Sequence, residues 1–218
     1  MARNIIFKKI TFNNVNYKNF DKFIIKKGLF VFPAGPALAN IEKSKKYYES
    51  IKKADLVFFD SGFFVILLKI FKNIGVDKFS GYKFLKLFFV YLKKNKKKKV
   101  FCIDPNLKFS KSNKYFLKNL GLKKVYNYLA PNYDIDNLLD KKLLDLIKKV
   151  KPNFILTNIG GGKQEVLGLY LKKNLKFNTT ILCTGGAISF FTKDQAPINA
   201  LIDELYLGWL IRLIFNPL

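Results

Sequence analysis

The sequence predicts one α/β domain spanning residues 1–218, with a mostly parallel sheet, helices on both faces of that sheet and a helical segment at the C-terminus. Three observations predict this fold. Short apolar runs of strand length alternate with longer helical patterns, the strand-length runs are apolar throughout, and no internal repeat or Ser/Pro-rich linker divides the chain. A length of 218 residues suits a single domain and is enough to bury a sizeable core.

The first half of the chain supplies two predicted strands and three predicted helices. Residues 28–33 and 56–59 are apolar runs of strand length. Residues 41–53 form a polar stretch that favours a helix, although it lacks a strong apolar stripe. Residues 63–72 and 82–94 are longer segments that end in lysines, as helix C-termini often do, and they predict two further helices.

The second half repeats this alternation of strand and helix, which is typical of a parallel sheet. Its predicted strands are residues 100–103, 124–129, 154–157 and 180–183. Its predicted helices are residues 112–120, 137–150, 164–173 and about 198–215. Ligands of such sheets bind beyond the carboxyl ends of the strands, so functional residues are expected in the loops that follow the strands. Four of these loops contain Gly or Pro, which allow sharp turns and close approach to a ligand: residues 32–36, 60–62, 158–165 and 184–186.

The composition excludes several kinds of catalytic site. The chain has no histidine, which excludes Ser-His-Asp and Cys-His catalysis and any zinc site with histidine ligands. The two cysteines, Cys102 and Cys183, are too few for a disulfide framework or a cysteine-only metal site, and a reducing, cytoplasmic compartment is the default. We therefore expect no metal ion.

The 40 basic and 15 acidic residues give a net charge of +25, which predicts an anionic partner: nucleic acid, an anionic membrane surface or a phosphorylated substrate. Lysine is abundant along the whole chain, so the net charge does not choose among these partners. The most concentrated run is residues 93–99, and two interpretations of it stay open. It is either a solvated helix terminus or a contact with anionic lipid, worth about 1 kcal/mol per lysine near the surface.

The apolar segments are too short to cross a bilayer. The most apolar stretches, residues 63–68 and 87–92, are about six residues long, whereas a spanning helix needs about 20. The N-terminus lacks the long apolar run and the small-residue cleavage site of a signal peptide. We expect a protein that lies on a membrane without crossing it.

Asp60 directly follows an apolar strand, at the start of one of the four loops. A carboxylate at this position projects into the crevice, where loss of solvent raises its pKa and makes it a useful base. The alternative is that Asp60 caps the following helix, for which aspartate is well suited. Its position alone leaves both interpretations open.

The glycine-rich loop at residues 160–163 partly resembles a phosphate-binding P-loop. The full pattern fails because Thr157 stands where the first glycine is needed and Gln164 replaces the Ser or Thr after the lysine. What remains is a glycine turn before a helix N-terminus, which can bind a diphosphate through backbone N–H groups. Gln164 and Glu165 are candidate ligand-binding residues, although the spacing favours an interaction of Glu165 with the helix dipole.

Arg212 lies close to the apolar stripe of the last predicted helix, about 20° from Leu205 on a helical wheel. A guanidinium on such a stripe needs an anionic partner. A structural carboxylate such as Glu204 and a substrate phosphate, which arginine binds through two parallel hydrogen bonds, are equally compatible with the sequence.

Together these segments resemble the WecG/TagA/CpsF family of glycosyltransferases. The matching blocks occur in family order and are residues 54–62, 79–82, 160–165, 185–188, 196–197 and 207–213. The pairing of the Gly-x-x-Gln-Glu block with the Trp-Leu-x-Arg-Leu helix is the most specific feature. The resemblance extends from about residue 28 to the end of the chain.

The resemblance implies a Rossmann-like enzyme of surface polysaccharide biosynthesis in the cell envelope. Such an enzyme transfers a hexose from a nucleotide sugar, typically UDP-linked N-acetylmannosamine, with inversion. The acceptor is a polyprenyl-diphosphate-linked sugar, which implies a peripheral protein on the cytoplasmic face of the membrane. No cofactor is expected besides the nucleotide-sugar substrate.

The resemblance also assigns roles to individual residues. Asp60 matches the proposed catalytic base, Gln164 matches a residue of the nucleotide-sugar pocket, and Arg212 lies in the basic segment that holds the diphosphate. Lys78 stands where the family has an arginine. The predicted substrate-binding residues are Lys78, Gly81, Gly160, Gly161, Gly162, Gln164, Glu165, Gly185, Gly186 and Arg212.

Two other functions fit parts of the sequence. The positive charge fits a nucleic-acid-binding α/β domain, although no RNA-binding signature is present and nucleic acid is not the expected partner. A catalytically inactive relative that scaffolds a membrane polysaccharide complex is the other alternative. An exposed apolar face on the last predicted helix would favour a homo-oligomer.

Overall fold

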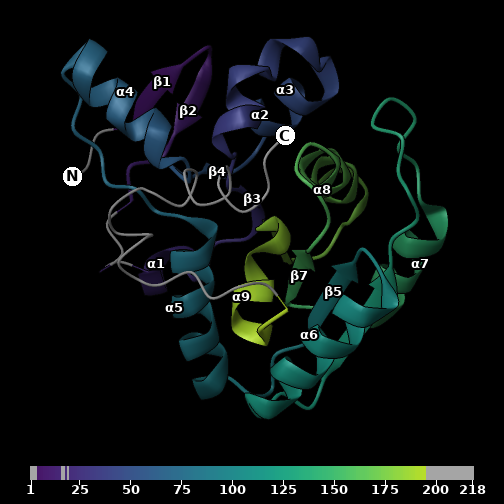
Figure 1. The fold of residues 1–218 in the computed structure, drawn as a ribbon. Helices are drawn as coiled ribbons and strands as arrows, with labels where there is room; N and C mark the ends of the chain where they lie inside the picture. The colour runs from purple at the N-terminus through teal and green to yellow at the C-terminus, as the bar shows by residue number, and fades with distance from the viewer. Residues whose placement is uncertain (1–3, 16–17, 19, 195–218) are drawn as a thin grey trace.

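The computed structural model describes residues 4–15, 18 and 20–194. Within this part of the chain, a six-stranded sheet has the strand order β4-β3-β8-β7-β5-β6, and every neighbouring pair is parallel (Figure 1). The strands are β3 (Gly28–Val31), β4 (Leu56–Val57), β5 (Val100–Asp104), β6 (Val125–Leu129), β7 (Phe154–Thr157) and β8 (Thr180–Cys183). A separate antiparallel hairpin consists of β1 (Ile5–Phe7) and β2 (Ile10–Phe12).

Helices cover both faces of the sheet, so the prediction of a single α/β Rossmann-like domain is confirmed (Figure 1). The longer ones are α3 (Lys45–Lys52), α4 (Gly62–Lys72), α5 (Gly81–Lys94), α6 (Leu107–Asn119), α7 (Lys141–Val150) and α8 (Lys163–Asn174). The short ones are α1 (Phe20–Ile24), α2 (Gly35–Ala39), η2 (Ile41–Lys43), η3 (Gly185–Ile188) and α9 (Ser189–Thr192). Helices α3, α7 and α8 pack on one face, and α1, α5 and α6 pack on the other.

Alternate strand residues supply two apolar cores, one on each face of the sheet, because successive side chains of a strand point to opposite faces. Leu29 and Val31 join the core beneath α3 and α8, whereas Phe30 and Phe32 join the core beneath α5. The second core is rich in phenylalanine, and the ring of Phe32 stacks on that of Phe58 with centroids 4.6 Å apart. The two cores hold the loops at the carboxyl edge of the sheet in fixed positions.

Helix caps explain where the predicted element boundaries are wrong. Helix α6 begins at Leu107 rather than at residue 112, because the side chain of Asn106 accepts a hydrogen bond from the N–H of Phe109 (3.1 Å). Helix α7 begins at Lys141 rather than at residue 137, because Asp140 caps it through the N–H of Leu143 (2.8 Å). The predicted helix over residues 198–215 lies outside the described residues.

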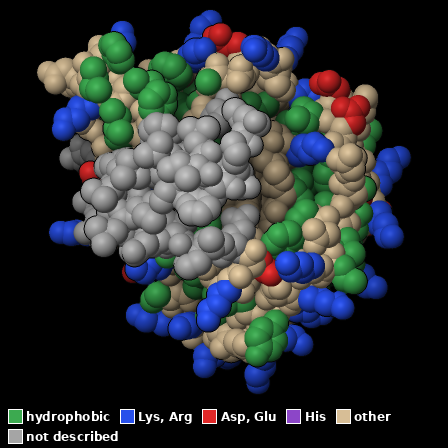
Figure 2. Space-filling view, in the orientation of Figure 1, with side chains coloured by type: hydrophobic (Ala, Val, Ile, Leu, Met, Phe, Trp, Pro, Cys, Tyr) green, Lys and Arg blue, Asp and Glu red, His purple; other side chains and the backbone are tan. Residues whose placement is uncertain are grey.

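The surface carries lysines on many elements and one notable group of exposed apolar side chains. Figure 2 shows lysines spread around the rim of the visible face, with hydrophobic side chains gathered over α4 and the adjacent hairpin. Ile66, Ile70 and Phe71 of α4 are exposed, as are Lys69 and Lys72 of the same helix. In the part of the chain that the structure describes, we find no helix with the length and apolar character needed to span a bilayer.

Candidate functional site

The predicted site residues that lie in the described part of the chain lie along the carboxyl edge of the parallel sheet. Asp60 follows β4, the glycines of residues 160–162 follow β7, and Gly185 and Gly186 follow β8. Because parallel strands end at the same edge, all three loops open on one side of the molecule, where this class of fold binds its ligands.

The carboxylate of Asp60 is held at the N-terminus of helix α5. Its Oδ1 accepts a hydrogen bond from the backbone N–H of Gly81, the first residue of that helix, at 2.8 Å. The following helix, α4, is capped instead by Ser61, which accepts from the N–H of Phe64 at 3.2 Å. The interpretation that Asp60 caps the following helix is therefore wrong, and the half-buried carboxylate is oriented by a more distant helix.

Gly81 and Lys78 both lie next to Asp60. The N–H of Phe79 donates to the carbonyl of Phe59 at 2.8 Å, which places half-buried Lys78 beside the end of β4. A Cβ added to Gly81 would lie 3.7 Å from side-chain atoms of Phe32 and Thr184, so Gly81 packs against the ends of β3 and β8. The N-terminus of α5 thus connects the Asp60 loop to the loop after β8.

The glycine loop after β7 is fixed from within by Glu165. Its Oε2 accepts from the N–H of Gly162 at 2.7 Å and closes the N-terminus of α8, as the dipole interpretation predicts. Gly162 has a φ of +85°, a conformation that favours glycine. A Cβ added to Gly160 or Gly161 would meet nothing within 4 Å, so a ligand can approach this backbone closely.

Gln164 links the two glycine loops. Its Oε1 accepts from the N–H of Gly185 at 2.7 Å, and its Nε2 donates to Oε1 of Glu165 at 3.0 Å. Both side chains are buried beneath the loops after β7 and β8, and their hydrogen bonds fix the positions of these two loops relative to each other. The position of Gln164 and Glu165 just after the glycine loop marks them as candidates in the sequence, but the bond from Gln164 to Gly185 is seen only in the structure.

Three ionisable side chains share one electrostatic environment at this edge. The pKa of Glu165 is raised to about 7, chiefly by burial and in smaller part by the negative charge of Asp60, while hydrogen bonds from the backbone and from Gln164 act to lower it. Burial also raises the pKa of Tyr47 on α3, with Glu165 and Asp60 among its charged neighbours. The hydroxyl of Tyr47 is buried and has no hydrogen-bond partner among the described residues. Glu165 is therefore a carboxyl group that titrates near neutral pH.

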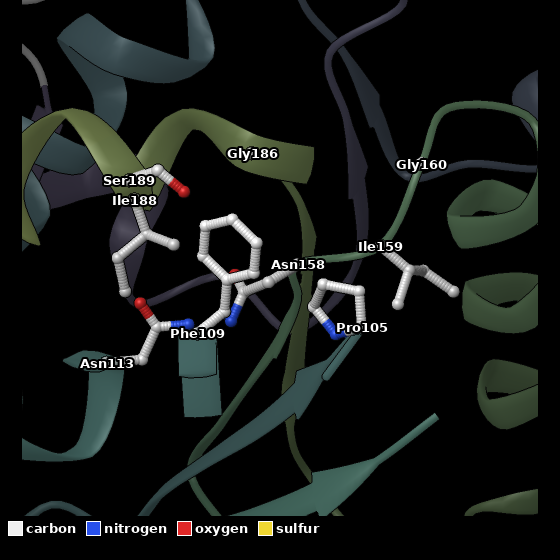
Figure 3. Close-up of a pocket in the computed structure, with 9 residues that line it drawn as sticks. All are labelled: Pro105, Phe109, Asn113, Asn158, Ile159, Gly160, Gly186, Ile188 and Ser189. Atoms are coloured by element: carbon white, nitrogen blue, oxygen red, sulfur yellow. The ribbon is translucent and has the colours of Figure 1, made fainter. Parts of the chain in front are cut away.

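A cavity of about 200 Å³ opens beside the glycine loops (Figure 3). It lies at the carboxyl ends of β5, β7 and β8 and includes Gly160 and Gly186 of the predicted set. Its lining residues are Pro105, Phe109, Asn113, Asn158, Ile159, Gly160, Gly186, Ile188 and Ser189. In the strand order, β4 and β7 are three strand spacings apart, about 14 Å, which is the approximate span between the Asp60 loop and the cavity.

A comparison with protein families matches residues 4–218 to the glycosyl transferase WecG/TagA/CpsF family, which is nearly the whole chain. The chain belongs to this family. The comparison with curated proteins finds no match. Membership identifies the protein as a glycosyltransferase of polysaccharide biosynthesis and confirms the resemblance found in the sequence.

The WecG/TagA/CpsF fold of this chain contains a cluster that the sequence reasoning missed. Asp104 ends β5, and Asn113 and Asn158 line the cavity beside it. Asp104 is the last residue of a buried strand and Asp60 comes shortly after one, and an aspartate at the end of an apolar run is the signal that could have found it. Arg212 lies outside the described residues, as does the predicted helix that carries it. Among the described residues, no group of three or more Asp, Glu or Cys side chains is arranged to hold a metal ion.

Proposed function

We propose that this glycosyltransferase transfers a hexose from a nucleotide sugar of the UDP-N-acetylmannosamine type to a polyprenyl-diphosphate-linked acceptor, with inversion at the anomeric carbon. The observation that carries the proposal is the shared edge of the sheet. Asp60 stands at the β4 end of it, and the glycine loops held by Gln164 and Glu165 follow β7 and β8, nearer its middle. A nucleotide sugar is elongated, so its diphosphate can bind the backbone N–H groups of the glycine loops while its sugar reaches toward the carboxylate of Asp60.

The proposed reaction is a single displacement, which inverts the anomeric carbon. Asp60 takes the proton of the acceptor hydroxyl while that oxygen forms its bond to the anomeric carbon. The bond between this carbon and the diphosphate oxygen breaks, and the nucleoside diphosphate leaves with the electron pair. N–H groups of the glycine loop at the N-terminus of α8, together with Lys78 and Arg212, stabilise the charge that develops on it.

Thermal stabilisation by a panel of nucleotide sugars tests the donor assignment. A ligand that binds only the folded protein stabilises it by about 2.7 kcal/mol at a hundred times its Kd, so the donor should raise the Tm. We expect UDP-sugars to stabilise the protein more than ADP- or GDP-sugars. The absence of stabilisation by every nucleotide sugar, together with salt-sensitive binding to nucleic acid, would contradict the proposal and support the nucleic-acid-binding alternative.

The lipid-linked acceptor requires a surface that faces the membrane, and α4 fits this role better than the lysine run at residues 93–99. Helix α4 begins at Gly62, directly after the Asp60 loop, and exposes Ile66, Ile70 and Phe71 beside two exposed lysines. The lysine run lies at the far end of α5, whose 14 residues span about 21 Å from the Asp60 loop. An anionic membrane against α4 would bring the acceptor head group to Asp60.

Sedimentation with anionic liposomes tests this surface. Phe71→Glu should lower the bound fraction, because it removes an apolar contact and adds a repelled charge next to anionic lipid. Leu139→Glu is the matched control, since Leu139 is 73% exposed and Phe71 is 75% exposed, but Leu139 lies before α7. Equal binding of both variants would contradict a membrane contact through α4. If the wild-type protein binds neutral and anionic liposomes equally, electrostatic attraction does not contribute to the contact.

A further inference from the structure

The turn of the N-terminal hairpin holds two lysines in a left-handed backbone conformation. The register of β1 and β2 leaves Lys8 and Lys9 as a two-residue turn between the strands. Their φ angles are +46° and +59°, values that such turns normally give to asparagine or glycine. The hydroxyl of Tyr48 on α3 donates to the carbonyl of Lys8 at 3.0 Å and holds the turn against this helix. Strained backbone that tertiary contacts hold in place is typical of functional sites.

A basic cavity of about 470 Å³ opens beside this turn. Its lining residues are Lys8, Lys9, Glu42, Lys45 and Tyr48. Nζ of Lys8 forms an ion pair with Oε2 of Glu42 at 3.1 Å, and Glu42 is the one carboxylate among these lining residues. Lys9 and Lys45 are exposed, and neither forms an ion pair or a hydrogen bond with a described residue. Two of the three positive charges in the lining therefore lack a counter-ion in the described part of the chain.

The chemistry of this lining fits a phosphate group. Ammonium groups that lie close together repel one another, and an anion bound between them removes that repulsion. Lysine binds phosphate as a compact point charge with three rotatable donors. Three lysines and one glutamate give the lining a net charge of +2. This charge matches a phosphate monoester, whose charge at pH 7 is about −1.5 to −2.

The hairpin connects this cavity to the exposed apolar surface of α4. It packs on α4 through Phe7 and Phe64, whose ring centroids lie 4.9 Å apart. Ile6 of β1 is 74% exposed, so the exposed apolar side chains continue from α4 onto the hairpin. Figure 2 shows lysines at the upper edge of this face, next to the hydrophobic side chains over α4 and the hairpin. A basic cavity beside an apolar surface favours a ligand that has both a phosphate group and hydrocarbon chains.

We propose that this cavity binds the phosphate group of a membrane lipid. Lys9 and Lys45 donate to the phosphate oxygens, and the ion pair with Glu42 holds Lys8 beside them. The hydrocarbon of the bilayer then meets Ile6 and the exposed side chains of α4. The proposal rests on the membrane contact proposed for α4, and it adds a head-group site whose lining contains none of the predicted catalytic or substrate-binding residues.

Binding to vesicles of two compositions tests the site. One composition contains phosphatidate, a phosphate monoester, and the other contains enough phosphatidylglycerol, a diester, to give the same zeta potential. The variant Lys9→Asn/Lys45→Gln removes both unpaired charges, and asparagine tolerates the left-handed conformation of residue 9. We expect the wild-type protein to bind phosphatidate vesicles about tenfold more tightly than phosphatidylglycerol vesicles, and the variant to lose this preference.

The matched control is Lys141→Gln/Lys151→Asn. Lys141 is the first residue of α7, as Lys45 is of α3, and Lys151 has a φ of +50°, close to that of Lys9. Both control positions are exposed, so the control removes the same charge from equivalent positions on another element. It should keep the preference within about twofold. Lys45→Gln alone leaves the turn unchanged and serves if the double variant does not fold; it should reduce the preference about threefold.

An equal loss of phosphatidate binding in variant and control would overturn the site, because net charge alone would then explain the binding. Calorimetric binding of inorganic phosphate that depends on Lys9 and Lys45, without a vesicle preference, would overturn the lipid as the source of the phosphate. Turnover of a nucleotide sugar with a detergent-dispersed acceptor requires no vesicle, so the variant should retain it. A wild-type protein with turnover but without the vesicle preference overturns the site alone. One with the preference but without turnover overturns the transferase proposal and keeps the site.

Discussion

Asp60 and Asp104 occupy equivalent places in the fold but have very different surroundings. Asp104 ends β5 and Asp60 comes after β4, so both lie at the carboxyl edge of the same sheet. Asp60 is half-buried, and its Oδ1 accepts from the N–H of Gly81. Asp104 is fully buried, and three asparagine amides donate to its two oxygens.

The difference shows that the environment, and not the residue type, decides which carboxylate can react. A general base must reach a substrate proton, and only a carboxylate at the surface of the site can do so. Asp104 is enclosed by its amide donors, which makes it suited to orienting neighbouring groups. The same substitution at the two positions should therefore have opposite consequences for activity and stability.

Asp60→Asn should produce the largest effect, a loss of turnover of about 10³-fold, because it removes a general base while keeping its shape. The amide oxygen can still accept from Gly81, so the Tm and the affinity for the donor should change little. Steady-state kinetics with a nucleotide sugar and a lipid-linked acceptor, together with a thermal melt, measure both. Near-normal turnover would remove Asp60 from the role of base.

Asp104→Asn should mainly lower stability, by about 3 kcal/mol, because it places an amide NH₂ group among three amide donors in a buried site. Urea denaturation of this variant beside Asp60→Asn measures the contrast. If Asp104→Asn unfolds no more easily than Asp60→Asn, the two carboxylates do not differ as their environments indicate.

Glu165 should give a smaller effect that depends on pH. Its pKa is raised to about 7 in the folded protein, chiefly by burial, from 4.5 in the unfolded chain. The folded state therefore retains this proton to higher pH, so the contribution of Glu165 to the free energy of unfolding is greatest below pH 4.5 and is lost as the pH rises through about 7. The total loss is at most about 3 kcal/mol. Urea denaturation as a function of pH measures it.

Glu165→Gln is the control for this pH dependence. The variant cannot titrate at this position, so its stability should lose the decrease between pH 4.5 and 7. An equal decrease in both proteins would assign the effect to other groups. Because Asp60 contributes to the raised pKa, Asp60→Asn should also move the midpoint to lower pH.

The alternation of apolar strands and helices was sufficient to predict the parallel sheet, because buried parallel strands are apolar on both faces. The short N-terminal hairpin was not predicted. Its burial depends on contacts with residues far along the chain, such as the stacking of Phe12 on Phe59 with centroids 5.1 Å apart. The sequence pattern around Phe12 does not indicate a packing partner that lies so far along the chain.

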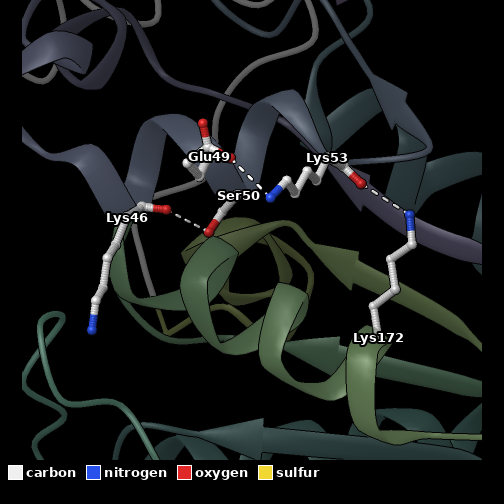
Figure 4. A network of polar contacts seen from close by, with 5 residues as sticks. All are labelled: Lys46, Glu49, Ser50, Lys53 and Lys172. Carbon is white, nitrogen blue, oxygen red and sulfur yellow. Dashed lines mark hydrogen bonds and ion pairs between the residues drawn. The ribbon is translucent and has the colours of Figure 1, made fainter.

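The polar stretch at residues 41–53 illustrates a second limit. It forms η2 and α3, and its buried side chains include Tyr47 and Ile51. Polar contacts surround these side chains (Figure 4). Lys53 forms an ion pair with Glu49 at 3.0 Å, and Lys172 of α8 donates a hydrogen bond to the carbonyl of Lys53 at 2.9 Å. The helix was predictable from its composition, but its packing against α8 required the tertiary structure.

The site was predictable where its parts are adjacent in the sequence. Glu165 lies three residues after Gly162, from whose N–H it accepts, whereas the hydrogen bond of Gln164 to Gly185, 21 residues later, needed the structure. The Asp104 cluster was missed because its asparagines lie 9, 23 and 54 residues away from the carboxylate. Asparagine is also common throughout this chain, so no local pattern distinguishes these three.

A crystal structure of the protein with an intact nucleotide sugar would test the central claim most directly. We predict that the nucleotide lies at the cavity beside the glycine loops, with its diphosphate along Gly160 and Gly186. The anomeric carbon should lie near Asp60, with room between them for an acceptor hydroxyl. A nucleotide sugar bound away from this edge of the sheet, or with its sugar directed away from Asp60, would contradict the account.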